Sequence, residues 1–406
     1  MDDLSDLIPR FDLAGMDLQL DRMDAALQQL CHPCFDIPAI QVVGTNGKGS
    51  IVRFIEAALL QAGIRCGATT SPHLISWCER IRIQGHAIET TTLRSLLIEL
   101  QEISRKQRLT PFELLTTAAL LQFARQRVEL LVLEVGLGGR LDATTAHPYR
   151  PVIAMGQIGL DHCEHLGESL TAIAHEKAAA IPVGATVISA GQHPDVHAVF
   201  DQVCRDQQAR LQWVSPLPDD WVLGLNGCIQ RSNAAVARGA LQALAPLNWQ
   251  LTDDQLRAGF AAAHWPGRLQ VVSWQRQPLR LDGAHNPPAA EQLAMERCRW
   301  TDGPSRVNWI LAIQRHKEAL KMLDQLLQPQ DRAWITPVPH HRSWTREDLI
   351  DRQPAWRDQL HAATSVEAVL EHLDNEQGTW PHPMPVVAGS LYLLGDLFAR
   401  KVVAAE

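Results

Sequence analysis

Residues 37–63 read IPAIQVVGTNGKGSIVRFIEAALLQAG, and this stretch decides the fold. It begins with apolar, mostly β-branched residues at 37–43, which are typical of a buried strand. Small and polar residues follow at 44–50, and the apolar residues of 51–62 then recur at helical spacing until Gly63. A strand, a glycine-containing loop and a helix in this order predict a phosphate-binding loop in an α/β domain.

The loop can supply both backbone and side-chain contacts to phosphate. Its residues are Gly44, Thr45, Asn46, Gly47, Lys48, Gly49 and Ser50. Small residues let N–H groups converge on phosphate oxygens, and the next helix adds the positive end of its dipole. The Lys48 ammonium provides a positive charge for the β- and γ-phosphates. The usual pattern is G-x-x-x-x-G-K-[ST], whereas here Gly49 separates Lys48 from Ser50. We interpret the loop as an ATP site rather than an ordinary glycine turn.

Two more buried strands are predicted, at 128–135 and 151–158, with a buried helix at 112–125 before them. Strands that alternate with helices indicate a central, mostly parallel sheet. Glu134 ends the first of these strands, and Asp161-His162 follows the second. A carboxylate at such a strand end can reach a magnesium ion, although a solvated strand end would look the same.

A second, smaller α/β domain is predicted after an alanine-rich helix at 233–244. The Pro-Gly step in His264–Arg268 breaks the pattern, so the expected domains are 1–267 and 268–406. The polar turn LDGAHNP at 281–287 could form a ligand site at a strand end or an ordinary Asx-type turn. Strands are predicted at 279–281, 307–312, 333–336 and 385–388, and helices near 288–300, 317–328, 346–351, 365–374 and 390–403.

Composition excludes several other classes of protein. The net charge of −8 argues against a protein devoted to nucleic acid. The N-terminus resembles no secretory signal, and no apolar run approaches about 18 residues, so we expect a cytoplasmic protein without a membrane span. The eight cysteines are expected to be free thiols. For the lone CxxC at Cys31–Cys34 we favour a structural role over a redox pair or half of a zinc site.

Lys177 lies in a predicted helix at 170–181, next to Glu176. On the helical pattern alone we expect an exposed lysine there.

Taken together, these residues resemble the folylpolyglutamate synthase and dihydrofolate synthase family, a branch of the Mur-ligase-like ATP-dependent amide ligases. The similarity spans most of the chain, and its motifs occur in order. They are GTNGKGS (44–50), TSPHL (70–74), ERI (79–81), FELLT (112–116), EVGLGGRLDATT (134–145), GLDHCEHLG (159–167), HEKA (175–178), Asn233-Ala234, PGRL (266–269), LDGAHNP (281–287) and GSLYL (389–393).

The resemblance implies a fold, a reaction and residue roles. It implies an N-terminal P-loop ATPase domain, a C-terminal Rossmann-like domain and an active site in the cleft between them. The expected ligands are ATP, two Mg²⁺ ions, L-glutamate and dihydropteroate or a reduced folate, and the expected state is a monomer. The implied roles are ATP binding by Asn233, Arg268, Asp282 and His285, metal binding by Ser71, Glu134 and His162, pterin binding by Thr110, Phe112 and Asp142, and catalysis by Lys48, His162 and a carbamylated Lys177.

Three motifs depart from the family pattern. A G-x-H-Q-x-x-N stretch has Ile229 in place of its histidine, and an E-K-A-G-I run becomes Glu176–Ile181, one residue longer and without its glycine. A D-K-D motif appears as His316-Lys317-Glu318. These departures bear on substrate contacts and leave the phosphate loop and the metal residues intact.

The implied reaction phosphorylates a carboxylate and then transfers the acyl group to the amine of glutamate. Three alternatives remain open. They are an enzyme with only one of the two family activities, a Mur-type peptidoglycan ligase and a P-loop nucleotide switch. The phosphate loop at residue 44 leaves little room for the extra N-terminal domain of a Mur ligase, and a second α/β domain with its own polar turn argues against a switch.

Overall fold

The structure is a computed structural model that describes residues 4–9, 19–300, 305–377 and 379–405. The chain divides into two compact units. The first comprises residues 1–224 and 230–264, and the second comprises residues 225–229 and 265–406. The short stretch 225–229 therefore belongs with the C-terminal half of the chain.

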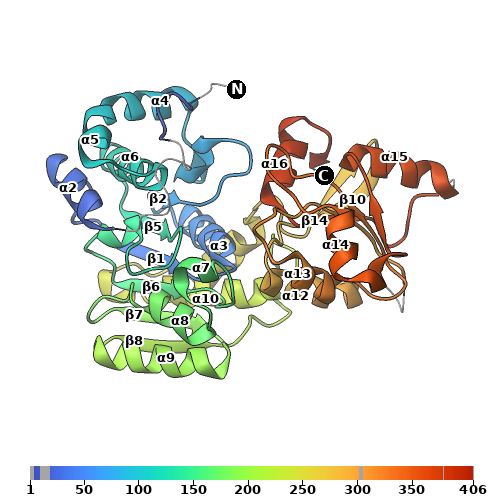
Figure 1. Cartoon of the computed structure of the whole chain (residues 1–406). Helices are drawn as coiled ribbons and strands as arrows, with labels where there is room; N and C mark the ends of the chain where they lie inside the picture. The colour runs from blue at the N-terminus through green and yellow to red at the C-terminus, as the bar shows by residue number, and fades with distance from the viewer. Residues whose placement is uncertain (1–3, 10–18, 301–304, 378, 406) are drawn as a thin grey trace. The chain divides into compact units, whose positions relative to one another are not determined.

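The first unit is built on a sheet of eight described strands in the order β4-β3-β2-β5-β1-β6-β7-β8 (Figure 1). The run from β2 to β8 is parallel, and only β3 and β4 at one edge are antiparallel. The strands are β1 (Ala39–Val43), β2 (Cys66–Thr69), β3 (Ile81–Ile83), β4 (His86–Ala87), β5 (Leu130–Glu134), β6 (Val152–Met155), β7 (Thr186–Ala190) and β8 (Arg210–Val214).

Helices cover both faces of this sheet. The face that carries Leu131, Ile153 and Val187 packs against α6, α8 and α9. On the opposite face α3 contacts β1, β2 and β5, and α10 lies against Ile188. The helices are α2 (Asp21–Gln29), α3 (Lys48–Gln61), α4 (Thr90–Glu99), α5 (Gln101–Gln107), α6 (Pro111–Arg125), α7 (Cys163–Leu166), α8 (Leu170–Ala178), α9 (Pro194–Asp206), α10 (Ile229–Gln242) and α11 (Asp253–Ala262).

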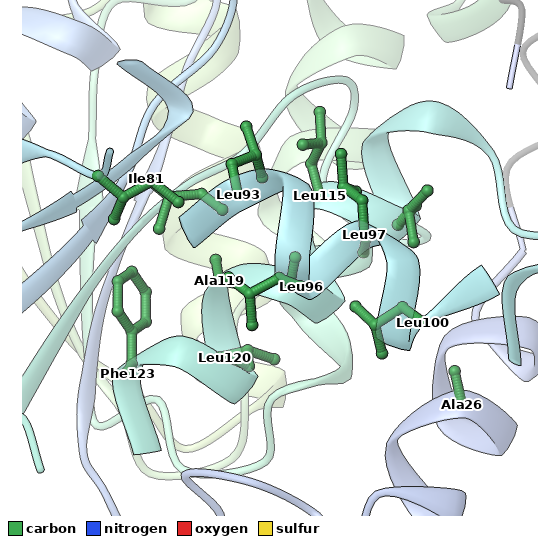
Figure 2. Packing of buried hydrophobic residues seen from close by; sticks show 14 of the residues in the cluster. Ala26, Ile81, Leu93, Leu96, Leu97, Leu100, Leu115, Ala119, Leu120 and Phe123 are labelled. Carbon is green, nitrogen blue, oxygen red and sulfur yellow. The ribbon is translucent and has the colours of Figure 1, made fainter. Parts of the chain in front are cut away.

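A leucine-rich cluster joins α4, α5 and α6 to the sheet, and Figure 2 shows its packing. Leu93, Leu97 and Leu100 are fully buried in it. Phe123 of α6 lies against the backbone of β2, where a side chain on Gly67 would come within 2.5 Å of the ring. The absence of a side chain at Gly67 therefore lets α6 lie close to β2, whose carboxyl end leads to Ser71.

The second unit has a sheet of seven described strands in the order β13-β12-β11-β14-β10-β9-β15. The five strands from β13 to β10 are parallel, and β9 and β15 complete one edge as antiparallel strands. The elements are β9 (Gln270–Trp274), β10 (Gln277–Leu281), α12 (Pro287–Met295), β11 (Asn308–Leu311), α13 (Ala319–Leu326), β12 (Arg332–Ile335), α14 (Arg346–Arg352), β13 (Leu360–Ala362), α15 (Val366–Gln377), β14 (Val386–Ala388), α16 (Leu391–Ala399) and β15 (Ala404–Ala405).

The predicted strands and helices all occur, with shifted ends, and the α/β fold class is confirmed. The helix expected at 51–62 begins at Lys48, because the last residues of the glycine loop already form its first turn. The predicted strand at 279–281 is the end of β10, whereas β3, β4, β7, β8, β9, β13 and β15 were not predicted. The partly exposed edge strand β8 and the β9–β10 hairpin lack the continuous apolar run that identified the central strands.

Membrane and cysteine expectations can also be compared with the structure. In the described ranges, no helix combines the length and apolar character needed to cross a membrane. All eight cysteines lie in those ranges and are free thiols. Burial raises the pKa of Cys34 to about 12, and its Sγ donates to the Leu120 carbonyl at 3.0 Å, so this thiol packs as part of the core.

Close packing of α11 on α3 yields a stability prediction. A side chain at Gly259 of α11 would lie 2.4 Å from the Cα of Ala58 in α3. Gly259→Ala should therefore push α11 away from α3, the helix that follows the phosphate loop. We expect a loss of about 1–3 kcal/mol in the free energy of unfolding, measured by chemical denaturation. Gly191→Ala is the matched control because a side chain there meets nothing within 4 Å. Equal stability of the two variants would contradict this account.

Candidate active site

Gly47 fixes the shape of the phosphate loop. It has φ of 84°, a left-handed conformation that favours glycine, and it immediately precedes α3. A side chain there would lie 2.5 Å from Oδ1 of Asn233. Asn233 comes from α10 and is buried, so it has little room to move away from such a side chain. Its Nδ2 donates to Oε1 of Gln230 at 3.0 Å. The sequence-predicted nucleotide residue Asn233 is thus brought directly against the loop.

The loop is anchored to the segment that follows β6. The N–H groups of Thr45 and Asn46 both donate to the Gln157 carbonyl, at 2.9 and 3.1 Å. The Thr45 hydroxyl lies 3.0 Å from the carbonyl oxygen of Gly159. Those two amides are therefore used within the protein. Helix α3 begins at Lys48, two residues after Asn46, and the N–H groups at a helix N-terminus are suited to bind phosphate oxygens.

Two lysine side chains meet at the start of this loop. Nζ of Lys48 donates to the carbonyls of Gly44 and Thr45, both at 3.1 Å. Nζ of Lys177, from the last turn of α8, donates to the same Gly44 carbonyl at 3.0 Å. The amine of Lys48 comes from α3 and the amine of Lys177 from α8. Both reach the start of the loop, where the terminal phosphates of ATP are expected.

Lys177 is buried, which corrects the expectation of an exposed lysine from the helical pattern. Its side chain is only 4% exposed because α8 packs against the loop of residues 136–145. A side chain on Gly139 would lie 2.7 Å from the Lys177 carbonyl oxygen. Burial, reinforced by the charge of Lys48, lowers the pKa of Lys177 to about 7. The amine is thus substantially neutral, and nucleophilic, near neutral pH.

The predicted metal residues follow neighbouring strands. Glu134 ends β5 and is buried, and its Oε2 accepts a hydrogen bond from the Ser71 amide at 3.1 Å, beyond the end of β2. His162 follows β6, has φ of 51°, and lies with Nε2 4.0 Å from Oδ2 of Asp161. Since β2, β5, β1 and β6 are adjacent and parallel, these side chains and the phosphate loop all lie at the carboxyl ends of the strands.

The chemistry of this donor set can be compared with the needs of magnesium. Among the described residues, no group of three or more His, Cys, Asp or Glu side chains is gathered as a metal cage. Magnesium commonly binds one or two carboxylates and takes its remaining ligands from water and phosphate. The Glu134 carboxylate and the Ser71 hydroxyl fit that pattern, whereas the imidazole of His162 is a less typical ligand.

Two of the predicted pterin residues converge on Gly136. The Phe112 ring lies so close that a side chain on Gly136 would come within 2.8 Å of it. The Gly136 amide donates to Oδ2 of Asp142 at 2.8 Å. Thr110 caps α6 from its N-terminus, and its hydroxyl accepts from the Glu113 amide at 3.3 Å. Phe112 and Asp142 therefore border one loop, and Thr110 is the N-cap of α6, two residues before Phe112.

Asp142 is committed to that loop on both oxygens. Oδ2 also accepts from the Leu137 amide at 3.1 Å, and Oδ1 accepts from the Thr144 amide and hydroxyl at 3.0 and 2.6 Å. Burial raises the pKa of this carboxyl, and the hydrogen bonds from Thr144 oppose the shift. Asp142 thus shapes the loop, while a direct contact with pterin stays a prediction.

In the second unit, the predicted nucleotide residues are gathered around Gly283. Asp282 accepts from the amides of Leu269 and Ala284, at 2.9 and 2.8 Å. Nδ1 of His285 lies 2.8 Å from the Gly283 carbonyl oxygen, and a side chain on Gly283 would come within 3.0 Å of the Arg268 guanidinium. Burial raises the pKa of Asp282, and the charge of Arg268 opposes that shift.

The sequence analysis missed two buried polar residues next to this site, Gln41 and Arg150. Gln41 lies in the middle of β1 and is fully buried, and Arg150 precedes β6 and is 8% exposed. Gln41 interrupts an otherwise apolar strand, and that interruption was an available signal for a buried polar role. Nothing in the pattern around Arg150 predicts its burial.

The chain was compared with known proteins and solved structures. Residues 268–400 match the family model described as dihydrofolate synthetase, C-terminal domain. The dihydrofolate synthase/folylpolyglutamate synthase of Bacillus subtilis is 30% identical over 422 residues, covering 95% of this chain and 95% of that protein. The chain belongs to the dihydrofolate synthase/folylpolyglutamate synthase family. The expected family resemblance is thereby confirmed.

Two solved structures of this family match nearly the whole chain. The folylpolyglutamate synthase of Mycobacterium tuberculosis, complexed with ADP and AMPPCP, has a TM-score of 0.84 and 28% identity, covering 95% of each chain. The Escherichia coli protein FolC, in complex with DHPP and ADP, has a TM-score of 0.83 and 26% identity, covering 98% of this chain and 95% of that one. The two-domain α/β fold predicted from the sequence is the fold of this family.

Burial of Lys177 predicts a pH-dependent cost to stability. Its pKa falls from 10.5 in the unfolded chain to about 7 in the folded one. Between these values only the unfolded chain holds the proton, so the cost grows as the pH falls from 10.5 to 7 and is constant below. Lys177→Met should therefore stabilise the protein more at pH 7 than at pH 9.5, measured by chemical denaturation in CO₂-free buffer.

The control for this measurement is Lys106→Met, at an exposed position, which should have the same small effect at both pH values. A Lys177→Met effect that does not change with pH would show that the amine keeps its ordinary proton affinity after folding.

Proposed function

We propose that this protein is an ATP-dependent ligase that joins L-glutamate to dihydropteroate and to reduced folates. The relatives from Bacillus subtilis and Escherichia coli bear the name of both activities, dihydrofolate synthase/folylpolyglutamate synthase. The single observation that carries the proposal is the group of residues at the carboxyl ends of the central strands of the first sheet. There the phosphate loop with Lys48 follows β1, Glu134 ends the adjacent β5, and Lys177 of α8 reaches the Gly44 carbonyl, in a chain of which 95% aligns with the Bacillus subtilis relative.

The reaction has two steps. A carboxylate oxygen of the pteroyl substrate attacks the γ-phosphorus of ATP, and the bond to the β-phosphate oxygen breaks, which releases ADP and leaves an acyl phosphate. The amine of glutamate then attacks the acyl carbon, phosphate leaves with the bonding electron pair, and the amine loses its proton. Phosphorylation is needed because an oxide is a poor leaving group from a carboxylate.

The phosphate loop and Lys48 are proposed to hold the ATP phosphates. The first turn of α3 offers N–H groups, and Lys48 adds a charge that offsets the negative charge on the phosphoryl group as it moves. Asn233 lies against the loop and contributes a polar side chain from α10. The ligand names of the Mycobacterium tuberculosis structure, ADP and AMPPCP, support an adenine nucleotide as co-substrate.

Magnesium would be held by Glu134 and Ser71, with His162 as a further ligand of one of two ions. A bound ion supplies positive charge to the phosphate oxygens. The Glu134 carboxylate is buried at the end of its strand and oriented by the Ser71 amide, which holds it ready for a cation. His162, next to Asp161, is better suited to ligation than to proton abstraction.

Lys177 is proposed to be carbamylated. Its neutral amine nitrogen would attack the carbon of CO₂ and release a proton, which leaves a carbamate anion beside the phosphate loop. A lysine with a pKa of about 7 meets the requirement for a neutral amine, whereas an exposed lysine near 10.5 does not. The positive charge of Lys48 would balance the new carboxylate, which could support the metal.

The remaining residues of the family motifs are proposed to bind the pterin and the nucleotide. Phe112, with Thr110 and the loop held by Asp142, would bind the pterin, which is consistent with DHPP in the Escherichia coli structure. In the second unit, Arg268, Asp282 and His285 are gathered at the carboxyl end of β10 and would contribute to the nucleotide.

A substrate panel tests the ligase and its two activities. Phosphate release from ATP should require L-glutamate together with dihydropteroate or tetrahydrofolate, and release with both acceptors would support two activities. Lys48→Ala should lower the rate by at least about 100-fold because it removes charge stabilisation of the transferred phosphoryl group. Lys106→Ala should have no effect. Phosphate release without either acceptor would favour a nucleotide switch, and near wild-type rates for Lys48→Ala would exclude the phosphate-loop assignment.

Carbamylation is tested by bicarbonate. Enzyme prepared in CO₂-free buffer should gain activity when bicarbonate is added, and native mass spectrometry should record an increase corresponding to one CO₂. Lys177→Ala should have low activity that bicarbonate does not restore. Full activity of an unmodified wild-type enzyme in CO₂-free buffer would argue against the carbamate.

A further inference from the structure

Arg150 lies where three segments of the first unit meet. It precedes the amino end of β6, and its side chain is buried and reaches the middle of β1. Nε donates to the His147 carbonyl at 2.7 Å. Nη1 donates to Oε1 of Gln41 and to the Ala180 carbonyl, both at 2.6 Å. One planar side chain therefore joins the strand that leads to the phosphate loop, the loop at 142–147 and the residues that follow α8.

Gln41 extends this contact toward the predicted pterin subsite. Its amide nitrogen donates to the hydroxyls of Thr144 and Thr145, both at 2.9 Å. The Thr144 hydroxyl donates in turn to Asp142, which holds the amides of Gly136 and Leu137. Gly136 is the residue against which the Phe112 ring packs. An unbroken series of hydrogen bonds thus leads from Arg150 to the loop beneath Phe112.

The other end of the series reaches Lys177. Ala180, which accepts from Arg150, lies three residues after Lys177, and its amide donates to the Lys177 carbonyl at 3.2 Å. The Thr145 hydroxyl donates to the Gly139 carbonyl at 2.7 Å, and Gly139 packs on the Lys177 backbone. Arg150 and Gln41 therefore hold the backbone on two sides of Lys177.

The charges in this region are also balanced by Arg150. Burial lowers the pKa of Arg150 to about 10, and the Asp142 carboxylate opposes the shift, so the guanidinium keeps its proton at neutral pH. Asp142 also acts on Lys177, whose proton affinity it raises. Asp142 therefore acts on Arg150 electrostatically, in addition to the hydrogen bonds that join the two residues through Gln41 and Thr144.

We propose that Arg150 is a positioning residue for the ligase reaction, which acts through Gln41 to fix the loop beneath the pterin subsite relative to Lys177. This inference rests on the proposed function. Arg150 is buried and hydrogen-bonded to protein groups, so its role is to set the geometry of groups that touch the substrates. Misplacement of such groups by about 1 Å can lower a rate about 100-fold.

A merely structural role makes a different prediction. Removing a buried hydrogen-bonded arginine lowers stability wherever it lies in a protein. Arg297 in the second unit provides the comparison, because it is equally buried and pairs with Asp331 at 2.7 Å. Arg150→Lys and Arg297→Lys should both lower the melting temperature, and only Arg150→Lys should alter the kinetics of folded enzyme.

The experiment is a double-mutant cycle on the full-length protein, assayed at a temperature where every variant is folded. Gln41→Met should raise KM for dihydropteroate about tenfold and change KM for ATP less than twofold, because it disconnects the loop while leaving Arg150 bound to Ala180. Arg150→Lys should also lower kcat about tenfold or more. The double variant should lose less than the product of the single losses in kcat/KM. If Arg150→Lys does not fold, Gln41→Met carries the test.

Three results would overturn the inference. They are unchanged kinetics of folded Arg150→Lys, independent effects of Arg150→Lys and Gln41→Met, and an equal loss of kcat in Arg297→Lys. A wild-type enzyme without glutamate-dependent phosphate release would instead refute the proposed function. Wild-type activity combined with fully active variants would refute the positioning role alone.

Discussion

The Gly44 carbonyl oxygen accepts hydrogen bonds from the amines of both Lys48 and Lys177, and much of the site depends on this shared contact. Burial, and then the charge of Lys48, lower the pKa of Lys177 to about 7, because two cations cannot approach one another closely in a buried site without cost. A neutral Lys177 can lie beside the phosphate loop where a charged one would be strongly disfavoured. The same lowered pKa underlies the proposal that Lys177 reacts with CO₂.

The surroundings of Lys177 follow from keeping it buried. The loop at 136–145 packs against α8, and the small size of Gly139 lets its backbone lie on that of Lys177. Asp142 fixes the loop by accepting amides from within it, so the loop keeps its shape without a longer helix or strand. Because Phe112 packs on the same loop, the predicted pterin subsite and the Lys177 side of the phosphate loop share one structural support.

The sequence predicted the central strands of the first sheet, because their residues are continuously apolar. Apolar runs at 37–43, 128–135 and 151–158 identified β1, β5 and β6, and the polar residues that follow them identified the functional edge. The edge strand β8 was missed because its exposure breaks the apolar pattern, whereas the short inner strand β7 was missed although its central residues are buried. Lys177 was misjudged from the helical pattern, because a hydrophobic period indicates which face of a helix is buried and gives no account of a polar group buried against a loop.

The sequence by itself therefore determined the phosphate loop, the central strands beside it and the family, since these depend on short motifs and local periodicity. Only the tertiary structure decided the burial of Lys177, the commitment of Asp142 to its loop and the position of Arg150. The contacts involved include Gly136 with Asp142, 6 positions apart, Arg150 with Gln41, 109 positions apart, and Lys177 with Gly44, 133 positions apart. Their energies come from desolvation and hydrogen bonding in the folded protein, which a linear pattern of residues does not record.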